Sequence, residues 1–331
     1  MRFKHYLAAG ATVVATAIAA PAMAEWPEKP IQLIVPWGAG GATDQVTRIV
    51  AAELEDALGQ NVVVVNQEGA SGSIGSKAAW DAPHDGYTWT AGAAKDLGTY
   101  AVTGKMDTSI KDWDLYLNSA LASVISVPAN SEINDLAGFL AALKAGGLKV
   151  GTSGVNSAGH SSIEALSNAV DGSYIHAIYD GGATAVQSTV AGETDVTTQL
   201  ISEQIDMLRA GVLKPIAIIS DSDVEVAGAG VIPSVLSELP DLAVAPIYFG
   251  IFIPGDVPDE VTAKMEAAWS DVMANSTALA EYTDGRGSIM TVFSGDEAQA
   301  KVWPSIQSNA WLLHDGGQST ISPDELDIPR P

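Results

Sequence analysis

Apolar residues in this chain recur as short runs of branched side chains, and each run is followed by a loop of small residues and a helical stretch. The first run spans residues 31–35, and its length and branching predict a buried strand. Pro36 ends that strand because proline lacks the amide hydrogen that a sheet requires. The alternation predicts an α/β fold whose sheets are mainly parallel and flanked by helices. Further strands are predicted at residues 61–66, 88–91, 148–152, 174–178 and 215–220.

Besides a small-residue elbow at residues 67–75, three glycine-rich elbows connect a strand to a helix, and residues 36–44 form the first of them. Its three glycines let the backbone approach a ligand closely, and the helix predicted to begin near Thr43 leaves its first amide hydrogens unpaired. Such amides lie at the positive end of the helix dipole and favour an anion. The alternative interpretation is a tight turn in which Thr43 or Asp44 only caps the helix.

Two similar elbows lie in the middle of the chain, the second at residues 153–160 and the third at residues 179–184. Each follows a predicted strand, leads into a helix and is rich in small residues. Ligands of α/β sheets bind beyond the carboxyl ends of the strands, so we expect these elbows to face one ligand. The repetition favours an anion site over a simple turn.

Two long apolar runs divide the chain, at residues 121–127 and 244–253. Each is long enough to cross from one domain to another. We expect a discontinuous first domain of residues 25–123 and 247–331, with a second domain of residues 124–246 inserted between its halves. Two lobes joined by two crossing strands are the plan of a hinged binding protein, in which a ligand carboxylate stabilises the closed form.

Residues 1–24 have the pattern of a cleavable export signal, with a basic start, an apolar stretch and small residues before Glu25. The chain has no cysteine, so it forms neither a disulfide nor a lipid-anchored cysteine. Its 40 acidic and 16 basic residues give a net charge of −24, which disfavours nucleic acid and anionic membrane surfaces as partners. These features predict a periplasmic protein, which we expect to be monomeric.

Catalysis and metal binding have little support in the sequence. The histidines beyond residue 24 lack the spacing of metal ligands on a helix, and the nucleophile motifs G-x-S-x-G and S-x-x-K are missing. Gly38-x-Gly40-x-x-Thr43 is a near miss of the dinucleotide fingerprint, but its third glycine is absent. We expect no catalytic residue, no cofactor and no metal; an exported hydrolase or a dinucleotide-binding enzyme is the alternative.

The order and spacing of many residues resemble the solute-binding receptors of tripartite tricarboxylate transporters, the TctC or Bug family. The resemblance is carried by residues 30–36, Gly40-Gly41, Thr43-Asp44, residues 85–88, Thr152-Ser153-Gly154, Gly181-Gly182 and Pro254-Gly255. It implies a two-lobed periplasmic binding protein that captures an organic carboxylate and delivers it to membrane permease subunits. Glu68 stands where this family usually has proline, and Asp180 where it usually has lysine. The ligand therefore stays open among di- and tricarboxylates and aromatic acids.

The resemblance also implies which residues hold the ligand. Amides of the first and second elbows would grip one carboxylate from opposite sides, and the third elbow would line the second lobe. The ligand-binding residues expected on this basis are Trp37, Gly38, Ala39, Gly40, Gly41, Thr43, Asp44, Ala93, Lys95, Thr152, Ser153, Asn156, Ser157, His160, Tyr179, Gly181, Gly182, Ala183, Gln199 and Tyr248.

Several of these side chains have an ordinary structural interpretation beside the functional one. Lys95 either pairs with the ligand carboxylate or is a solvated loop lysine. His160 either donates to the ligand or braces its elbow. Trp37 and Tyr248 either form apolar walls of the site or pack at the hinge. Gln199, at a predicted strand end, could bond to the distal part of the ligand.

Overall fold

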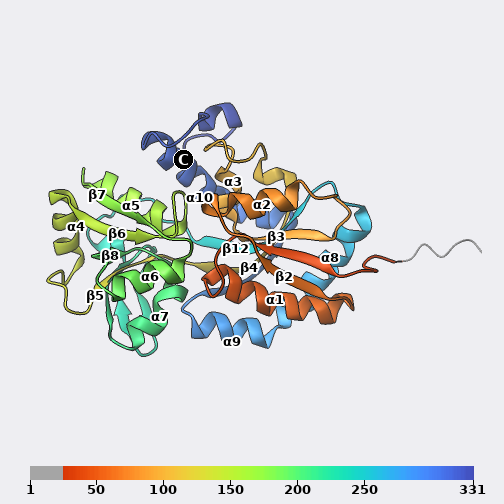
Figure 1. Ribbon diagram of the computed structural model, residues 1–331, viewed down its shortest axis with the longest axis horizontal. Coiled ribbons are helices and arrows are strands. Elements are labelled where there is room, and N and C mark those ends of the chain that lie inside the picture. The colour runs from red at the N-terminus through yellow and green to blue at the C-terminus, as the bar shows by residue number, and fades with distance from the viewer. Residues whose placement is uncertain (1–24) are drawn as a thin grey trace, which may run out of the picture.

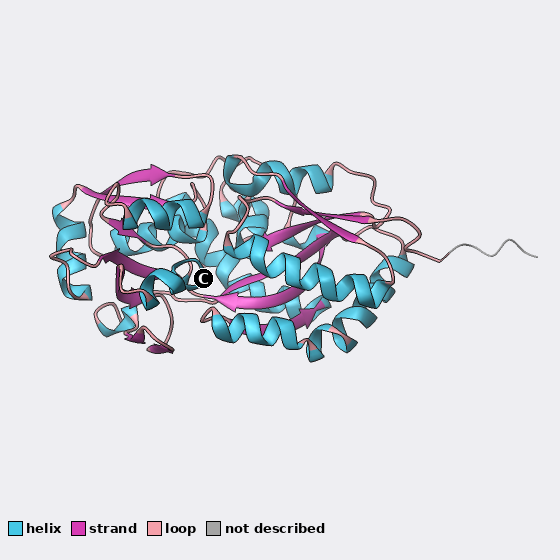
Figure 2. Ribbon diagram, turned by 60° about the horizontal axis from the view of Figure 1, so that its bottom comes forward, coloured by secondary structure: helices cyan, strands magenta, loops and turns pink. Residues whose placement is uncertain are grey.

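The structure, a computed structural model, describes residues 25–331, which form two α/β lobes side by side (Figures 1 and 2). The predicted export signal lies outside the described residues. Within them, no helix is both long and apolar enough to cross a bilayer. Lobe 1 contains β1 (Ile31–Val35), α1 (Ala42–Leu58), β2 (Val62–Asn66), α2 (Ser73–Trp80), β3 (Thr88–Ala93), α3 (Ala94–Thr99), β4 (Trp113–Leu121), β12 (Ile247–Pro254), α8 (Asp259–Asp271), α9 (Thr277–Gly285), β13 (Ile289–Ser294) and α10 (Gly295–Asp315). Lobe 2 contains β5 (Val124–Pro128), α4 (Leu136–Ala145), β6 (Leu148–Thr152), α5 (Ala158–Ala169), β7 (Tyr174–Ile178), α6 (Gly182–Val190), β8 (Val196–Thr197), α7 (Ile201–Arg209), β9 (Leu213–Ile218), β10 (Val224–Val226) and β11 (Gly230–Ile232).

The lobe 1 sheet has the strand order β13-β4-β12-β3-β1-β2. β1 pairs in parallel with β2 and β3, whereas β12 runs antiparallel to β3 and β4, and β13 antiparallel to β4. The sheet is therefore mixed and not mainly parallel as predicted. Strands β4 and β13 were not predicted from the sequence, and they supply two of the three antiparallel pairings.

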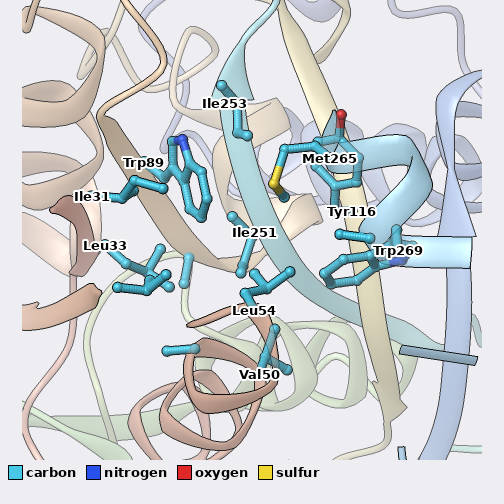
Figure 3. Packing of buried hydrophobic residues seen from close by; sticks show 14 of the residues in the cluster. Ile31, Leu33, Val50, Leu54, Trp89, Tyr116, Ile251, Ile253, Met265 and Trp269 are labelled. Carbon is cyan, nitrogen blue, oxygen red and sulfur yellow. The ribbon is translucent and has the colours of Figure 1, made fainter. Parts of the chain in front are cut away.

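The core of lobe 1 lies between this sheet and helices α1 and α8 (Figure 3). Ile31 and Leu33 of β1 and Trp89 of β3 are wholly buried there. Met265 and Trp269 of α8 pack against the same cluster. Each fully buried side chain of this kind contributes about 1.5–3 kcal/mol, so β1 and the elbow that follows it are anchored rigidly.

The lobe 2 sheet has the strand order β7-β6-β8-β5-β9. β6 is parallel to β7 and β8, and β5 is antiparallel to β8 and β9. The two elbows of this lobe follow the neighbouring parallel strands β6 and β7. Because parallel strands end at one edge of a sheet, both elbows lie at the edge that faces lobe 1 (Figure 1).

The two connections between the lobes differ from the predicted pair of crossing strands. The apolar run at 121–127 is divided, since β4 ends at Leu121 in one sheet and β5 begins at Val124 in the other. The run at 244–253 becomes a strand only at Ile247, and residues 238–246 before it form no strand. An extended run was predicted in both places because apolar side chains continue through the connection.

Candidate functional site

A small cavity between the lobes, here called the crevice, lies where the first and third elbows meet. Its volume is about 30 Å³, room for roughly one water molecule. A β-carbon placed on Gly38 would lie only 3.4 Å from the carbonyl oxygen of Asp180, so the lobes are closed on each other. Both lobes line the crevice, with Trp37, Gly38, Gly41, Ala42, Thr43, Asp96 and Phe249 from lobe 1 and Ser153, Ser157, Ala158, Gly182, Gln199, Leu200 and Glu203 from lobe 2.

Two helices begin at the crevice without a side-chain cap. α1 follows Gly41 in lobe 1 and α6 follows Gly181 in lobe 2, and neither N-cap residue makes a side-chain hydrogen bond. Their first amides are therefore free of the usual capping oxygen, as an anion site requires.

The carboxylate of Glu203 lies between these two helix ends. The amide of Ala42 donates to its Oε1 atom across the lobes at 3.3 Å. A β-carbon on Gly182 would lie 2.0 Å from the same oxygen, so the carboxylate lies directly against the first residue of α6. In this closed arrangement the protein's own carboxylate occupies the position in which we expect a ligand carboxylate to bind.

Glu203 lies in the first turn of α7 and keeps partial solvent exposure. Burial of its carboxyl group raises the pKa to about 7, although hydrogen bonds from the backbone of Ala42 and Leu200 act to lower it. Burial outweighs the two bonds because none of the described residues that line the crevice is a cation that could compensate an ionised carboxylate.

Asp44 stabilises the first elbow from behind. Its Oδ2 atom accepts the amide of Gly40 at 2.9 Å, while its Oδ1 atom accepts from Arg48 at 2.8 Å and from Asn66 at 2.9 Å. Burial acts to raise the pKa of Asp44, but these hydrogen bonds outweigh it and keep the pKa below its ordinary value. Asp44 is absent from the crevice lining, so its position fits the bracing role better than ligand contact.

The second elbow divides into crevice-lining and bracing residues. Ser153 and Ser157 line the crevice, and the Ser157 hydroxyl caps α5 by accepting the amide of His160. The His160 ring stacks on His176 with 4.6 Å between ring centroids. Burial, followed by the charges of His176, Lys95 and Lys105, lowers the pKa of His160 to about 3, so the ring is neutral and braces the elbow. Thr152 bonds through its hydroxyl to the His176 ring at 2.5 Å.

Asn156 and Lys95 join the lobes behind the crevice. The Lys95 ammonium donates to Asp96 at 2.6 Å and to the carbonyl oxygen of Asn156 at 2.9 Å. The Asn156 side chain accepts from Asn309 of α10 at 2.6 Å and donates to Thr99 at 2.9 Å. Lys95 lines a separate cavity of about 690 Å³ beside α5 and α10 and is already paired, so it is neither a solvated loop lysine nor a free partner for an anion in the crevice.

Gln199 is buried in the crevice wall, with 1% of its surface exposed. Within the part of the chain that the structure describes, its Nε2 atom has no hydrogen-bond partner. Trp37 and Phe249 supply the aromatic part of the lining. Tyr248 does not line the crevice; its ring packs edge-on against Phe293 with 6.3 Å between centroids. Neighbouring residues of a strand point to opposite faces, which explains why Phe249 faces the crevice and Tyr248 does not.

The remaining expected residues surround the crevice without lining it. Ala39 and Gly40 are exposed at the tip of the first elbow. Ala93 is buried in an apolar cluster with Ala42 and Phe249. In the third elbow, the Tyr179 amide donates to the carbonyl of Thr152, and Ala183 is half-buried in the first turn of α6. Among residues 25–331, no group of three or more His, Asp or Glu side chains is arranged to hold a metal ion.

A family model described as tripartite tricarboxylate transporter family receptor, TctC, matches residues 46–303. The chain belongs to this family. The TctC chain is also 27% identical over 328 residues to the protein BugT of Bordetella pertussis, covering 96% of this chain and 99% of BugT.

Solved structures share the fold of this TctC receptor. MatC from Rhodopseudomonas palustris with bound malate superposes with a TM-score of 0.73 at 22% identity, covering 88% of this chain and 97% of MatC. Another R. palustris protein, with adipate, gives a TM-score of 0.79 at 22% identity, covering 88% of this chain and 99% of that protein. The two-lobed periplasmic binding protein fold expected from the sequence is therefore confirmed.

Several residues that line the crevice of this receptor were not predicted from the sequence, above all Glu203 and Asp96. An acidic residue in the first turn of a helix is the ordinary complement to the helix dipole, so the sequence offered no signal that Glu203 faces another lobe. Asp96 adjoins Lys95 in sequence, and only this adjacency could have indicated the pair.

Proposed function

We propose that this protein is a periplasmic receptor, not an enzyme, that closes its two lobes around one carboxylate of an organic acid. The observation that carries the proposal is the position of Glu203: α1 of one lobe and α6 of the other begin against a single carboxylate. Backbone amides and helix dipoles supply this anion site, which fits a strongly acidic chain with few cations to spare.

The ligand class that we propose is a dicarboxylate or related organic acid. MatC with malate and the R. palustris protein with adipate support this class, because both ligands carry two carboxylates. Gln199 supports it further, since its unpartnered Nε2 atom can donate to an additional oxygen of the ligand. After capture, the receptor passes its ligand to membrane permease subunits of the transporter, as the family description and the export-type N-terminus suggest.

Thermal melting against a panel of acids tests this proposal. The panel contains malate, adipate, citrate and benzoate, with the uncharged diamide of adipate and NAD as comparisons. A bound acid at about a hundredfold excess over its dissociation constant stabilises the protein by roughly 2.7 kcal/mol, and the diamide has no such effect. Stabilisation by NAD alone would refute the receptor function.

A glycine variant locates the site. In Gly41→Val the new side chain points toward the crevice, because a β-carbon there lies 3.5 Å from Glu203 Oε1. The backbone at Gly41 has a φ of −74°, which valine adopts without strain. Gly285→Val is the matched control, since its β-carbon meets no atom within 4 Å. Equal ligand-induced shifts in both variants would refute the site.

A further inference from the structure

Glu203 places a negative charge where the proposed ligand must bring its own. Its carboxylate contacts the first amide of α1 and the first residue of α6, and these are the groups that would hold a ligand carboxylate. The free volume beside it is about 30 Å³, too small for a second carboxylate together with the carbon chain that carries it. A ligand therefore enters only if Glu203 gives up this position.

Gln199 gives independent evidence that the crevice binds a further acceptor. Its side chain is buried and lines the crevice, yet its Nε2 donor has no partner among residues 25–331. An unpaired buried donor costs about 1–3 kcal/mol, which an incoming oxygen would recover. The crevice thus retains a donor that Glu203 does not use.

We propose that Glu203 is an internal competitor of the ligand carboxylate, and that ligand capture is coupled to the uptake of one proton by Glu203. This inference rests on the receptor function proposed above. The proton comes from solvent and forms an O–H bond on the Glu203 carboxyl group, while the ligand keeps its charge. Protonated Glu203 binds helix-end amides weakly, because it no longer complements their positive potential, and so it releases them to the ligand.

The charged groups around Glu203 favour proton uptake, and not proton release, when the ligand binds. Asp96 lines the same crevice, and its charge is paired with Lys95. Arg286 of α9 is paired with Asp206 of α7 at 2.6 Å, and the Tyr282 hydroxyl of α9 is buried without a partner. Glu68 adds a further carboxylate near the first elbow, 3.1 Å from a β-carbon on Gly38.

A ligand anion in this setting repels ionised Glu203, with no unpaired cation among the crevice-lining residues to offset it. The pKa of Glu203, already about 7 through burial, therefore rises on ligand binding. Above pH 7 the receptor must take up a proton to bind, and its affinity falls by up to about tenfold for each further pH unit.

Titration calorimetry with malate and adipate at pH 6, 7, 8 and 9 tests the coupling. Both probes are ionised throughout this range. The wild type should bind about fivefold more weakly at pH 8 than at pH 7, and about tenfold more weakly at pH 9 than at pH 8. About one proton should be taken up at pH 8 and 9 when two buffers of different ionisation enthalpy are compared. Glu203→Gln should bind with one affinity at all four pH values and take up no proton. Glu193→Gln, an exposed carboxylate of the same lobe, should behave as the wild type.

Each outcome has a separate meaning. Equal pH dependence in the wild type and Glu203→Gln, or no proton uptake, overturns the coupling and leaves the receptor function standing. Failure of every panel acid to bind any variant overturns the receptor function itself. In that case thermal melting without ligand still tests whether Glu203 is a buried internal competitor. The difference in Tm between Glu203→Gln and the wild type should then widen by several degrees from pH 5 to pH 8. A Tm difference that stays constant over this pH range overturns the internal competition by Glu203.

Discussion

Replacing Glu203 by glutamine should change how the stability of the ligand-free protein depends on pH. The folded-state pKa of about 7 lies above the ordinary value of 4.5 because burial disfavours the charged form. Between these two values the folded protein holds a proton that the unfolded chain has released. Stability from this group is therefore complete below pH 4.5 and is lost as the pH rises through 7.

The size of this loss follows from the gap between the two pKa values. At about 1.4 kcal/mol for each pH unit, the gap between 4.5 and about 7 corresponds to roughly 3 kcal/mol. This is an upper limit, since Glu203 keeps partial exposure. Glutamine has a similar shape and no charge, so Glu203→Gln does not lose this stability as the pH rises. Relative to the wild type, its free energy of unfolding should increase by up to about 3 kcal/mol between pH 4.5 and pH 8.

Urea denaturation at pH 5, 6, 7 and 8 measures the effect as a difference between variant and wild type. The difference is required because His160 contributes the opposite slope: its pKa of about 3 makes acidification below pH 6.5 destabilising. Glu193→Gln controls for the loss of one surface charge. A difference between Glu203→Gln and the wild type that stays constant within about 0.5 kcal/mol over this range would show that Glu203 is not a buried carboxylate in solution.

Three further predictions concern the groups around the crevice. Asp44→Ala should lower the free energy of unfolding, measured by urea denaturation, by about 1–3 kcal/mol, because Gly40, Arg48 and Asn66 lose their acceptor. The control Asp56→Ala, on the exposed face of α1, should lower it by less than about 0.5 kcal/mol. Equal losses in the two variants would contradict the bracing role of Asp44. Asn309→Ala removes the bonds to Asn156 and Ser161 that join the lobes, so small-angle scattering should show a larger radius of gyration. An unchanged radius would mean that these bonds do not hold the lobes closed. Gly182→Ala places a β-carbon 2.0 Å from Glu203 Oε1 and should displace that carboxylate. The affinity for malate should therefore depend less on pH than in the wild type. An unchanged pH dependence would show that Glu203 does not contact Gly182 in solution.

The sequence by itself determined the parts of this protein that rest on local pattern. Branched apolar runs such as residues 31–35 form strands wherever they are buried, and the small-residue loops that follow them form elbows before helices, as expected. These regularities depend on backbone geometry and on the period of burial, so they can be read one segment at a time. They were sufficient for the two-lobed fold and for the placement of elbows from both lobes at one crevice.

Only the tertiary structure decided what faces the crevice and with which charge. Lys95 was a candidate partner for the ligand, but folding places it against Asp96 and Asn156, while Glu203 of a distant helix reaches the start of α1. The strand β12 turns Phe249 toward the crevice and Tyr248 away from it, a choice set by register across the sheet. Electrostatic contacts depend on distances between residues far apart in sequence, and no local pattern encodes those distances.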